Sequence, residues 1–540
     1  MKNNIKFYGF LTLLLVLVSA CHDDLDRLPQ SNISQDNFYN DLTELEIGLA
    51  GVYDVLAKTK DGYGEGFMKM GVHGSHVATT FIGATKQNTQ AWFTFDNSEE
   101  SFWRFWGSSY KLIYRANQVI DRAALIEVEG ANDVVLKNRM VAEAKFLRAL
   151  MYFNLVRFWG DVPLIKEELL DLNNASSPRV SSKEVYDFII EDLKFAEANL
   201  FNASWVAANS PSYSGADLGR ATIGAAKGML AKVYLTRASY PLKEEAYYQM
   251  AYDKAKEVVV IDKHYILDNE YATLFTLAGE ESHEWMFQVQ HDYDLLQPGV
   301  WGGVNSPNGN KKALDWGNGR TMATLELLNH YDDEDPRFIH NIAQGKLNAD
   351  NSIKYDKNQN KSYSHKFRFS TKPVSSFNTS MNAPILRYAD IVLVYAEAAA
   401  NLGLDGDAFD ALDMIRNRAR GSQNFALNNA NFVPSAGTFP LAVDRLLTGD
   451  ALFDEIMWDR AKELCFEGTS KFDVFRLGET KFLELMQGQQ WDTDLSKDTN
   501  PLKDVPWANN VQPKHIIFPI PEAEIRGNKF ISSSDNNPGW

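Results

Sequence analysis

Apolar residues recur at steps of three and four positions through much of the chain, which is the period of an amphipathic helix. Residues 133–159 show this pattern over the longest stretch, at Val141, Ala144, Leu147, Leu150, Met151 and Leu155. Pro163 follows shortly afterwards, and a proline disfavours the helical conformation in the residue before it. The pattern therefore predicts a long helix that ends before Asp161. A second helix is predicted over residues 110–124.

The start of a third helix is marked by polar residues. Ser181 and Ser182 are good N-caps, and Glu184 is placed to complete a capping box. The apolar spacing that follows extends this helix to about Leu200.

Two pairs of helices are predicted farther along, at residues 219–238 with 245–260 and at 386–402 with 406–420. Small residues stand where paired helices would cross, with a large aromatic one turn away, as in tetratricopeptide repeats. These positions are Ala225, Gly228, Ala231, Tyr234, Ala251 and Ala255 in the first pair and Tyr388, Tyr395, Ala396, Ala399, Ala408, Ala411 and Ile415 in the second. Ordinary packing of alanine-rich helices is the alternative, and the two pairs are not contiguous.

Three stretches break the helical period: residues 59–109, 288–320 and 350–385, which contain many Gly, Asn, Ser, Trp and Phe residues. Loops longer than about 15 residues are uncommon in compact domains and are usually functional. The final segment from Val511 to Trp540 contains a β-like piece, residues 516–518, and must be held by packing against the body. We predict an all-α fold in which tetratricopeptide-like repeats support an irregular, loop-rich half.

The first residues have the pattern of an export signal. Lys2 and Lys6 precede an apolar run, Leu11 to Val18, that is too short to cross a bilayer. Val18-Ser19-Ala20-Cys21 then resembles the lipobox of bacterial lipoproteins, in which the cysteine is acylated and anchors the protein without a spanning segment. A plain secretory signal with a cysteine nearby is the alternative. We expect residues 1–20 to be a lipoprotein signal peptide and Cys21 to be the lipidation site.

Composition excludes several classes of protein. The 540 residues are 45% hydrophobic and 23% charged, with a formal charge of −17, which argues against binding to nucleic acid or to anionic lipid headgroups. The two cysteines, Cys21 and Cys465, cannot form a disulfide framework, and Cys465 is expected to be inert packing. No apolar run after residue 21 approaches the length of a membrane span.

Five segments in order along the chain resemble the SusD/RagB family, the surface glycan- or peptide-binding lipoproteins of Bacteroidetes. They are Tyr114 to Asn117, Glu143 to Ile165, Leu386 to Ala398, Glu463 to Arg476, and Phe518 to Ile525. The resemblance divides the mature chain into an N-terminal region, residues 21–215, and a C-terminal region, residues 216–540, within one compact unit. One departure is visible, because Ser470 and Lys471 stand where the family usually has arginine and an aromatic residue, which weakens any ion pair inferred there.

Charged residues of these motifs lie among apolar residues: Glu143, Arg148, Arg387, Asp390, Glu463 and Asp473. Buried charges are tolerated only when they are paired. We therefore expect these residues to be structural and not to form a binding site.

No catalytic motif or metal site is recognisable. HExxH, Walker and GxSxG motifs are absent, and His73 with His76 would supply only two zinc ligands. Residues 405–410 resemble a calcium loop but lack its later glutamate, so a helix N-cap is favoured. Residues 332–335 are expected to form a structural turn. We predict a non-catalytic protein without a cofactor; the enzymatic alternative is a helical glycosidase, whose two carboxylates no pattern marks.

Sugar rings stack on aromatic side chains and hydrogen-bond to amides, and the long loops contain both residue types. The candidate ligand-binding residues are Trp92, Tyr293, Trp301, Asn305 and Trp316. In the family that this chain resembles, ligand-contacting aromatic residues tend to come from loops in the regions that correspond to residues 59–109 and 288–320. Trp103 and Trp106 have helical spacing and are expected to pack in the core.

The resemblance implies capture of an oligosaccharide by a lipid-anchored outer-membrane protein that faces the cell exterior. It also implies delivery of that ligand to a SusC-like TonB-dependent transporter. Acidic residues just after Cys21, His22-Asp23-Asp24-Leu25-Asp26, resemble a surface-export signal, although a solvated tether would have the same composition. Capture of peptides, as in the RagB branch, is the alternative function.

Overall fold

The computed structural model describes residues 38–80, 89–171, 175–206, 211–215, 217–292, 299–301, 321–332, 335–344, 362–367, 379–421, 440–487 and 509–540. Its longer helices are α2 (Leu42–Leu56), α3 (Glu65–Val72), α4 (Glu100–Ala123), α5 (Ala131–Trp159), α6 (Ser182–Asn199), α7 (Ile223–Ala238), α8 (Ala246–Lys256), α13 (Tyr388–Asn401), α14 (Asp405–Gly421), α15 (Gly449–Leu464) and α17 (Glu479–Gln487). Shorter helices are α9 (Tyr271–Leu274), α11 (Leu325–His330), α12 (Pro336–Asn341), α16 (Ser470–Phe475) and α18 (Glu522–Gly527). A π-helical turn, η2 (Glu257–Asp262), continues α8, and 3₁₀ turns are η3 (Leu277–Gly279), η5 (Pro513–Ile516) and η6 (Ser533–Asp535).

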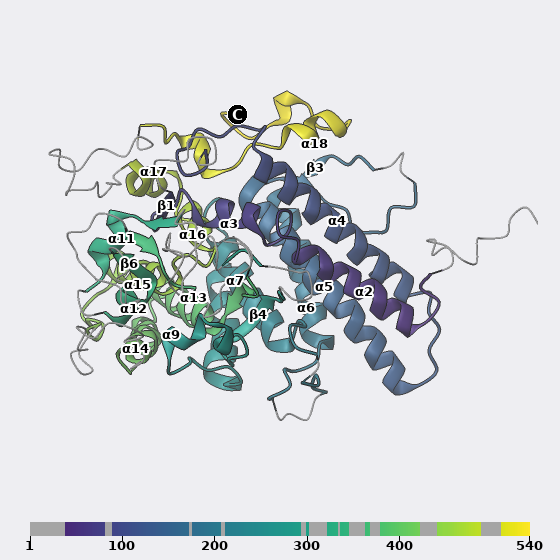
Figure 1. The fold of residues 1–540 in the computed structure, drawn as a ribbon, viewed down its shortest axis with the longest axis horizontal. Coiled ribbons are helices and arrows are strands. Elements are labelled where there is room, and N and C mark those ends of the chain that lie inside the picture. Colours follow the sequence, from purple (N-terminus) through teal and green to yellow (C-terminus); the bar gives the residue numbers. More distant parts are fainter. Residues whose placement is uncertain are drawn as a thin grey trace, which may run out of the picture.

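Helices dominate the molecule, as predicted, and one half is built almost entirely from them. Helices α2, α4, α5 and α6 lie together on the right of Figure 1, with α5 packed against both α4 and α6. Helix α5 covers the predicted range with two further residues at its start, and the Ser181 side chain caps α6 by accepting from the Glu184 N–H at 3.3 Å. Helix α4 begins at Glu100, ten residues before the predicted start, because Phe102, Phe105 and Trp106 already face the core.

Both predicted helix pairs are present. Helix α7 packs against α8, α13 packs against α14, and the two pairs meet where α13 contacts α7 and α8. Gly228 shows why a small residue is needed where α7 meets its neighbours. A Cβ atom there would lie 2.9 Å from Met286 Cε and 3.1 Å from Leu386 Cδ2, so the neighbouring elements approach α7 as closely as a glycine permits.

The loop-rich half contains short strands that the sequence pattern does not predict. A four-stranded antiparallel sheet has the order β1 (Ala78–Thr80), β5 (Thr321–Ala323), β7 (Ser362–Ser364) and β6 (Ile342–Gln344). Two further ladders join β2 (Val162–Pro163) to β3 (Arg179–Val180) and β4 (Trp285–Val289) to β8 (Ala383–Arg387). Three-residue strands are too short to show a recognisable alternation of apolar and polar residues.

The C-terminal segment, residues 509–540, is held by packing, as expected. Phe518 is fully buried, and its ring centroid lies 4.4 Å from that of Phe102 and 5.2 Å from that of Phe158. The indole N–H of Trp159 donates to the Pro519 carbonyl at 2.9 Å, which holds the segment over α4 and α5 (Figure 1).

The β-like interpretation of residues 516–518 is wrong. Pro513 starts a 3₁₀ turn there, capped by reciprocal bonds between Gln512 and His515, and residues 517–518 pair with no strand among the described residues.

Within the described ranges, no helix combines the length and the apolar character that crossing a membrane requires.

Candidate functional site

Pairing between β1 and β5 brings together the ends of two segments that adjoin or contain candidate ligand residues. Trp92 follows the first segment closely, and Asn305 and Trp316 lie within the second. Thr80, at the end of β1, pairs with Thr321, at the start of β5. The first loop, residues 81–88, begins directly after Thr80, and the second, residues 302–320, ends directly before Thr321. The sheet therefore fixes these loop ends side by side, as a binding surface built from both loops requires.

A second pair of loop ends is joined in the same half. Gly299 and Thr379 form an isolated antiparallel bridge, with N–H to O distances of 2.7 and 2.8 Å. Residues 293–298 end just before Gly299, and residues 368–378 end just before Thr379. Short ladders thus join described residues that are far apart in sequence.

Trp301 does not have the exposure expected of a ligand platform. Its side chain is fully buried, its indole N–H donates to the Tyr63 carbonyl at 2.9 Å, and its ring contacts Phe367 at a centroid distance of 5.8 Å. The expectation of an exposed ring is wrong for Trp301, because this indole fills the core beneath the loop and leaves no face open to a ligand.

Trp92 lies at the edge of the core, half-buried, close after the first loop. Its carbonyl accepts from the Asn510 side chain at 3.0 Å, and its indole nitrogen has no partner among the described residues. The other candidates, Tyr293, Asn305 and Trp316, lie outside the described residues, as does Cys21.

The two tryptophans of α4 differ. Trp106 is buried and donates to Glu524 at 3.0 Å, as predicted for a core residue. Trp103 is 40% exposed, which corrects the expectation that it packs in the core. Arg104 lies over its ring at 4.7 Å.

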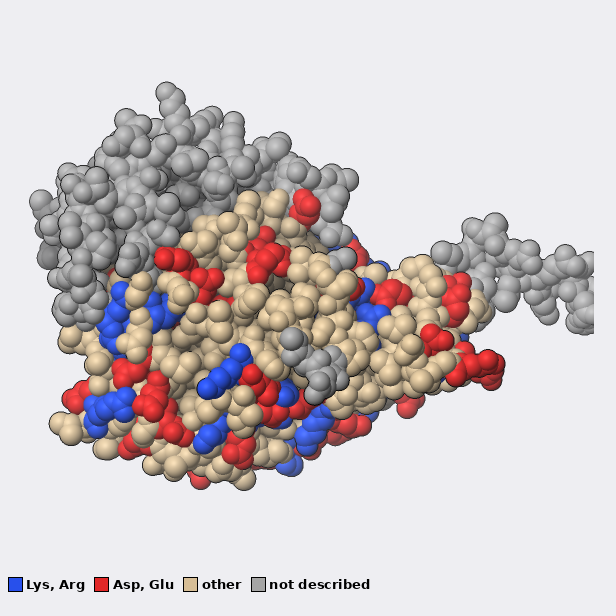
Figure 2. Space-filling view, turned by 90° about the horizontal axis from the view of Figure 1, so that it is seen from below, with Lys and Arg blue, Asp and Glu red and all other residues tan. Residues whose placement is uncertain are grey.

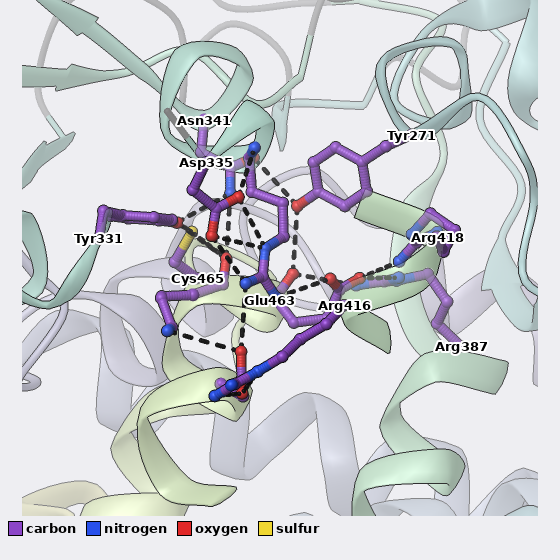
Figure 3. A network of polar contacts seen from close by, with 12 residues as sticks. Tyr271, Tyr331, Asp335, Asn341, Arg387, Arg416, Arg418, Glu463 and Cys465 are labelled. Carbon is purple, nitrogen blue, oxygen red and sulfur yellow. Dashed lines mark hydrogen bonds and ion pairs between the residues drawn. The ribbon is translucent and has the colours of Figure 1, made fainter. Parts of the chain in front are cut away.

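The charged family motifs form a buried ionic network, shown in Figure 3. Glu463 accepts from Arg387 at 2.8 Å and from Arg418, and Arg337 lies 3.6 Å away. Burial alone would raise the pKa of Glu463, but the three guanidinium groups outweigh it and lower the pKa to about 2. The charges balance one another inside the core, so the network is structural, as expected.

Two further networks include the remaining motif residues. Asp390 contacts Lys232 at 2.5 Å and Arg460 at 2.6 Å, and Arg460 continues to Asp473 at 2.8 Å. In the helical half, Arg148 binds both carboxylate oxygens of Asp192, at 2.8 and 2.9 Å. Glu143 pairs with Arg139 and Arg220 and accepts from the Tyr53 hydroxyl at 2.7 Å.

Lys471 departs from the family pattern and has a distinctive environment. The residue is fully buried, and its ammonium has no hydrogen-bond partner among the described residues. The ring of Phe518 lies 5.0 Å from Nζ, and burial lowers the pKa of Lys471 to about 7. Glu467 pairs instead with Arg387 and Lys366, both at 2.7 Å, so the weakened ion pair at Lys471 is confirmed.

The described residues contain no group of three or more His, Cys, Asp or Glu side chains that could hold a metal ion. His73 contacts Thr321 Oγ1 at 3.0 Å, and His76 packs against the ring of Trp458. Asp335 caps α12 and binds Arg337, which is the structural role expected there, whereas residues 333–334 of the acidic stretch lie outside the described residues. Cys465 is buried beside Tyr331.

Sequence reasoning missed several partners in the buried networks, namely Glu284, Lys366 and Arg418. Lys366 lies in a stretch interpreted as loop, and Glu284 directly precedes β4. Arg418 lies within α14, a helix that was predicted, but its spacing names no carboxylate partner. Nothing in the sequence pairs these three residues with their partners, so only the folded contacts identify them.

Comparison with known proteins agrees with this architecture. Two protein-family models match the sequence. The family described as "SusD family" matches residues 329–540, and the family described as "Starch-binding associating with outer membrane" matches residues 25–235. A SusD-like protein of Bacteroides ovatus is 26% identical over 96% of this chain and 95% of its own. A SusD-like protein of Formosa agariphila is 23% identical over 99% of both chains.

Solved structures show the same fold. A SusD homologue from Bacteroides thetaiotaomicron superposes with a TM-score of 0.77 at 22% identity, covering 95% of this chain and 99% of that one. A laminarin-binding SusD-like protein superposes with a TM-score of 0.69 at 23% identity, covering 93% of this chain and 100% of that one. The chain belongs to the SusD/RagB family, whose members are non-catalytic binding proteins associated with the outer membrane.

Proposed function

We propose that this protein captures an oligosaccharide at the cell surface and delivers it to a SusC-like TonB-dependent transporter. The observation that carries the proposal is the β1–β5 ladder, which fixes side by side the ends of two loops that contain aromatic and amide residues. Such residues supply the stacking faces and hydrogen bonds that sugar rings need.

The relatives support a glycan over a peptide. One family model is described as starch-binding, and one structural neighbour is described as laminarin-binding. The two named glycans, starch and laminarin, are therefore the first probes. A glycan array probed with residues 22–540 tests the proposal: binding to at least one glycan class supports it, whereas retention of peptides alone would assign the protein to peptide uptake.

The anchor follows from the N-terminal sequence. We propose that Cys21 is acylated after removal of residues 1–20 and holds the protein on the outer membrane, facing the exterior. A full-length Cys21→Ala variant should then appear in the soluble fraction after fractionation. Retention of the processed variant in the membrane would contradict the anchor without bearing on glycan binding.

The transporter is the proposed partner because the chain has the family fold over nearly its whole length. Solubilising outer membranes in mild detergent and capturing this protein by an affinity tag should recover a SusC-like transporter with it. Recovery of the tagged protein only as a free monomer would contradict delivery through such a complex.

A further inference from the structure

A cavity of 410 Å³ lies where the C-terminal segment crosses the ends of several helices, away from the β1–β5 ladder. Its walls come from the last turn of α5, the end of α7, helix α16 and two parts of the C-terminal segment, residues 513–517 and 538–539. The size falls within the range of about 300–1,000 Å³ that is typical of small-molecule sites. Most of the lining is apolar, including Val156, Phe472, Phe475, Ile516 and Ile517.

Arg157 is one of the residues that line this cavity, and its side chain is cationic. Its guanidinium lies between two aromatic rings, with Cζ 3.8 Å from the centroid of Phe153 and 3.6 Å from that of Phe472. Nε donates to the Phe153 carbonyl at 3.0 Å, and Nη2 donates to Asn154 Oδ1 at 2.6 Å. These acceptors are all neutral.

No carboxylate of the described residues forms an ion pair with Arg157, in contrast to its neighbour Arg476. Arg476 lines the same cavity, but Glu397 and Asp473 bind its guanidinium. Burial lowers the pKa of Arg157 only to about 10, so the side chain keeps its charge at neutral pH. Asp473 and Asp390 raise the pKa of Arg157 without bonding to it, and burial outweighs them. A carboxylate placed directly against the guanidinium would stabilise its charge.

We propose that this cavity is a second binding site, which takes a small organic acid. The carboxylate would pair with Arg157, and the hydrocarbon body would lie against Phe472 and Ile516. Most of the wall is apolar, which favours a hydrocarbon body over a sugar ring, although Ser182, Glu479 and Lys514 also line the cavity. The site is separate from the proposed glycan surface, so either can fail without the other.

Calorimetry with four probes tests the proposal. Octanoate and 3-phenylpropanoate carry the acid on an aliphatic and an aromatic body, and 1-octanol and 3-phenylpropan-1-ol are their neutral counterparts. A charge-assisted hydrogen bond to Arg157 should make at least one acid bind about tenfold or more tightly than its alcohol. The better acid identifies the body that the cavity prefers. Failure of both acids to bind, or equal affinity of each acid and its alcohol, would overturn the proposal.

Three variants locate the effect. Arg157→Gln should abolish the preference for the acid, whereas Arg526→Gln, an equal change of charge at a residue that is outside this cavity and whose side chain is 74% exposed, should keep it. Thr236 lines the cavity and donates only to a carbonyl of its own helix, so Thr236→Phe should fill the space without removing a tertiary bond. This variant should weaken binding of the better acid about tenfold or more with Arg157 in place.

Melting curves of all variants identify any loss of fold. If Arg157→Gln does not fold, acid binding by the Thr236→Phe variant tests whether the ligand occupies this cavity. Unchanged acid binding in a folded Thr236→Phe protein, or an acid preference that survives in folded Arg157→Gln, would place the ligand elsewhere and overturn the proposal.

Discussion

Arg148 and Asp192 show at the scale of single residues how this core tolerates charge. Their side chains are 2% and 0% exposed, and two hydrogen bonds join them between α5 and α6. Lys145 also contacts Asp192 at 2.8 Å, and Asn117 accepts from Arg148. Without Arg148, the buried carboxylate of Asp192 is paired only with Lys145.

Arg148→Ala should therefore lower the free energy of unfolding by about 3 kcal/mol, the lower end of the range for breaking a buried ion pair, because Lys145 remains. Arg526→Ala, which removes an exposed pair with Glu522, should change it by less than about 1 kcal/mol. Urea unfolding of the two variants measures both values. Equal stability of the two variants would show that the buried pair contributes little.

Lys471 predicts a dependence of stability on pH. Its pKa is about 7 in the folded protein against an ordinary value of 10.5, so between these values the unfolded chain binds a proton that the folded chain lacks. The free energy of unfolding should rise with pH across this window, by about 2 kcal/mol between about pH 7 and about pH 9. Below about pH 7 both states are protonated, and the lysine adds no further slope.

Lys471→Met should remove this contribution and stabilise the protein at neutral pH. Urea unfolding of parent and variant near pH 7 and near pH 9 measures the difference between their slopes. If the variant keeps the pH dependence of the parent, other groups are responsible and the buried amine is not.

At this scale the sequence predicted the structural role of the motif charges but failed for Trp301. An indole in a glycine-rich stretch without helical period has the pattern of a ligand platform. The structure instead buries Trp301: its ring contacts Phe367, and its indole N–H donates to the Tyr63 carbonyl. A tryptophan with this sequence pattern can therefore be part of the core as well as a ligand platform.

The C-terminal segment is held against the helical half by aromatic and polar contacts. Phe518 stacks on Phe102 and Phe158, and Asn537 donates to the carbonyl groups of Trp159 and Phe518. These contacts fix a segment that has few regular hydrogen bonds of its own.

Phe518→Ala should lower the free energy of unfolding by about 3–5 kcal/mol, as expected for truncating a buried phenylalanine. Phe530→Ala is the matched control, because Phe530 lies in the same segment and is 51% exposed. Its effect should stay below about 1 kcal/mol. Urea unfolding compares the two, and a small effect of both would mean that the segment adds little to the stability of the body.

Elements differed in how well the sequence predicted them. Helices α5, α6, α7 and α13 have long apolar periods, and their positions agree with prediction to within a few residues. The start of α4 was missed because glycine, asparagine and tryptophan residues just upstream obscure the period. The β1–β5 ladder could not be predicted, since its register depends on contacts between segments about 240 positions apart.

The whole molecule combines a helical scaffold with a half in which short ladders gather loop ends. On the face shown in Figure 2, the Lys and Arg side chains of the described residues are interspersed with Asp and Glu, and these residues form no broad basic area there. That distribution agrees with the acidic composition and with a neutral ligand such as a glycan.

Binding of a glycan by the loop half is the central claim, and calorimetry of aromatic variants tests it most directly. Stacking on one ring is worth on the order of 1 kcal/mol, so Trp92→Ala or Trp316→Ala should weaken binding of the cognate glycan up to about tenfold with little change in thermal midpoint. Trp103→Ala, at an exposed tryptophan of α4, is the control and should bind as the parent does. Trp301→Ala should instead melt well below the parent. Parental glycan affinity in both Trp92→Ala and Trp316→Ala would contradict the account.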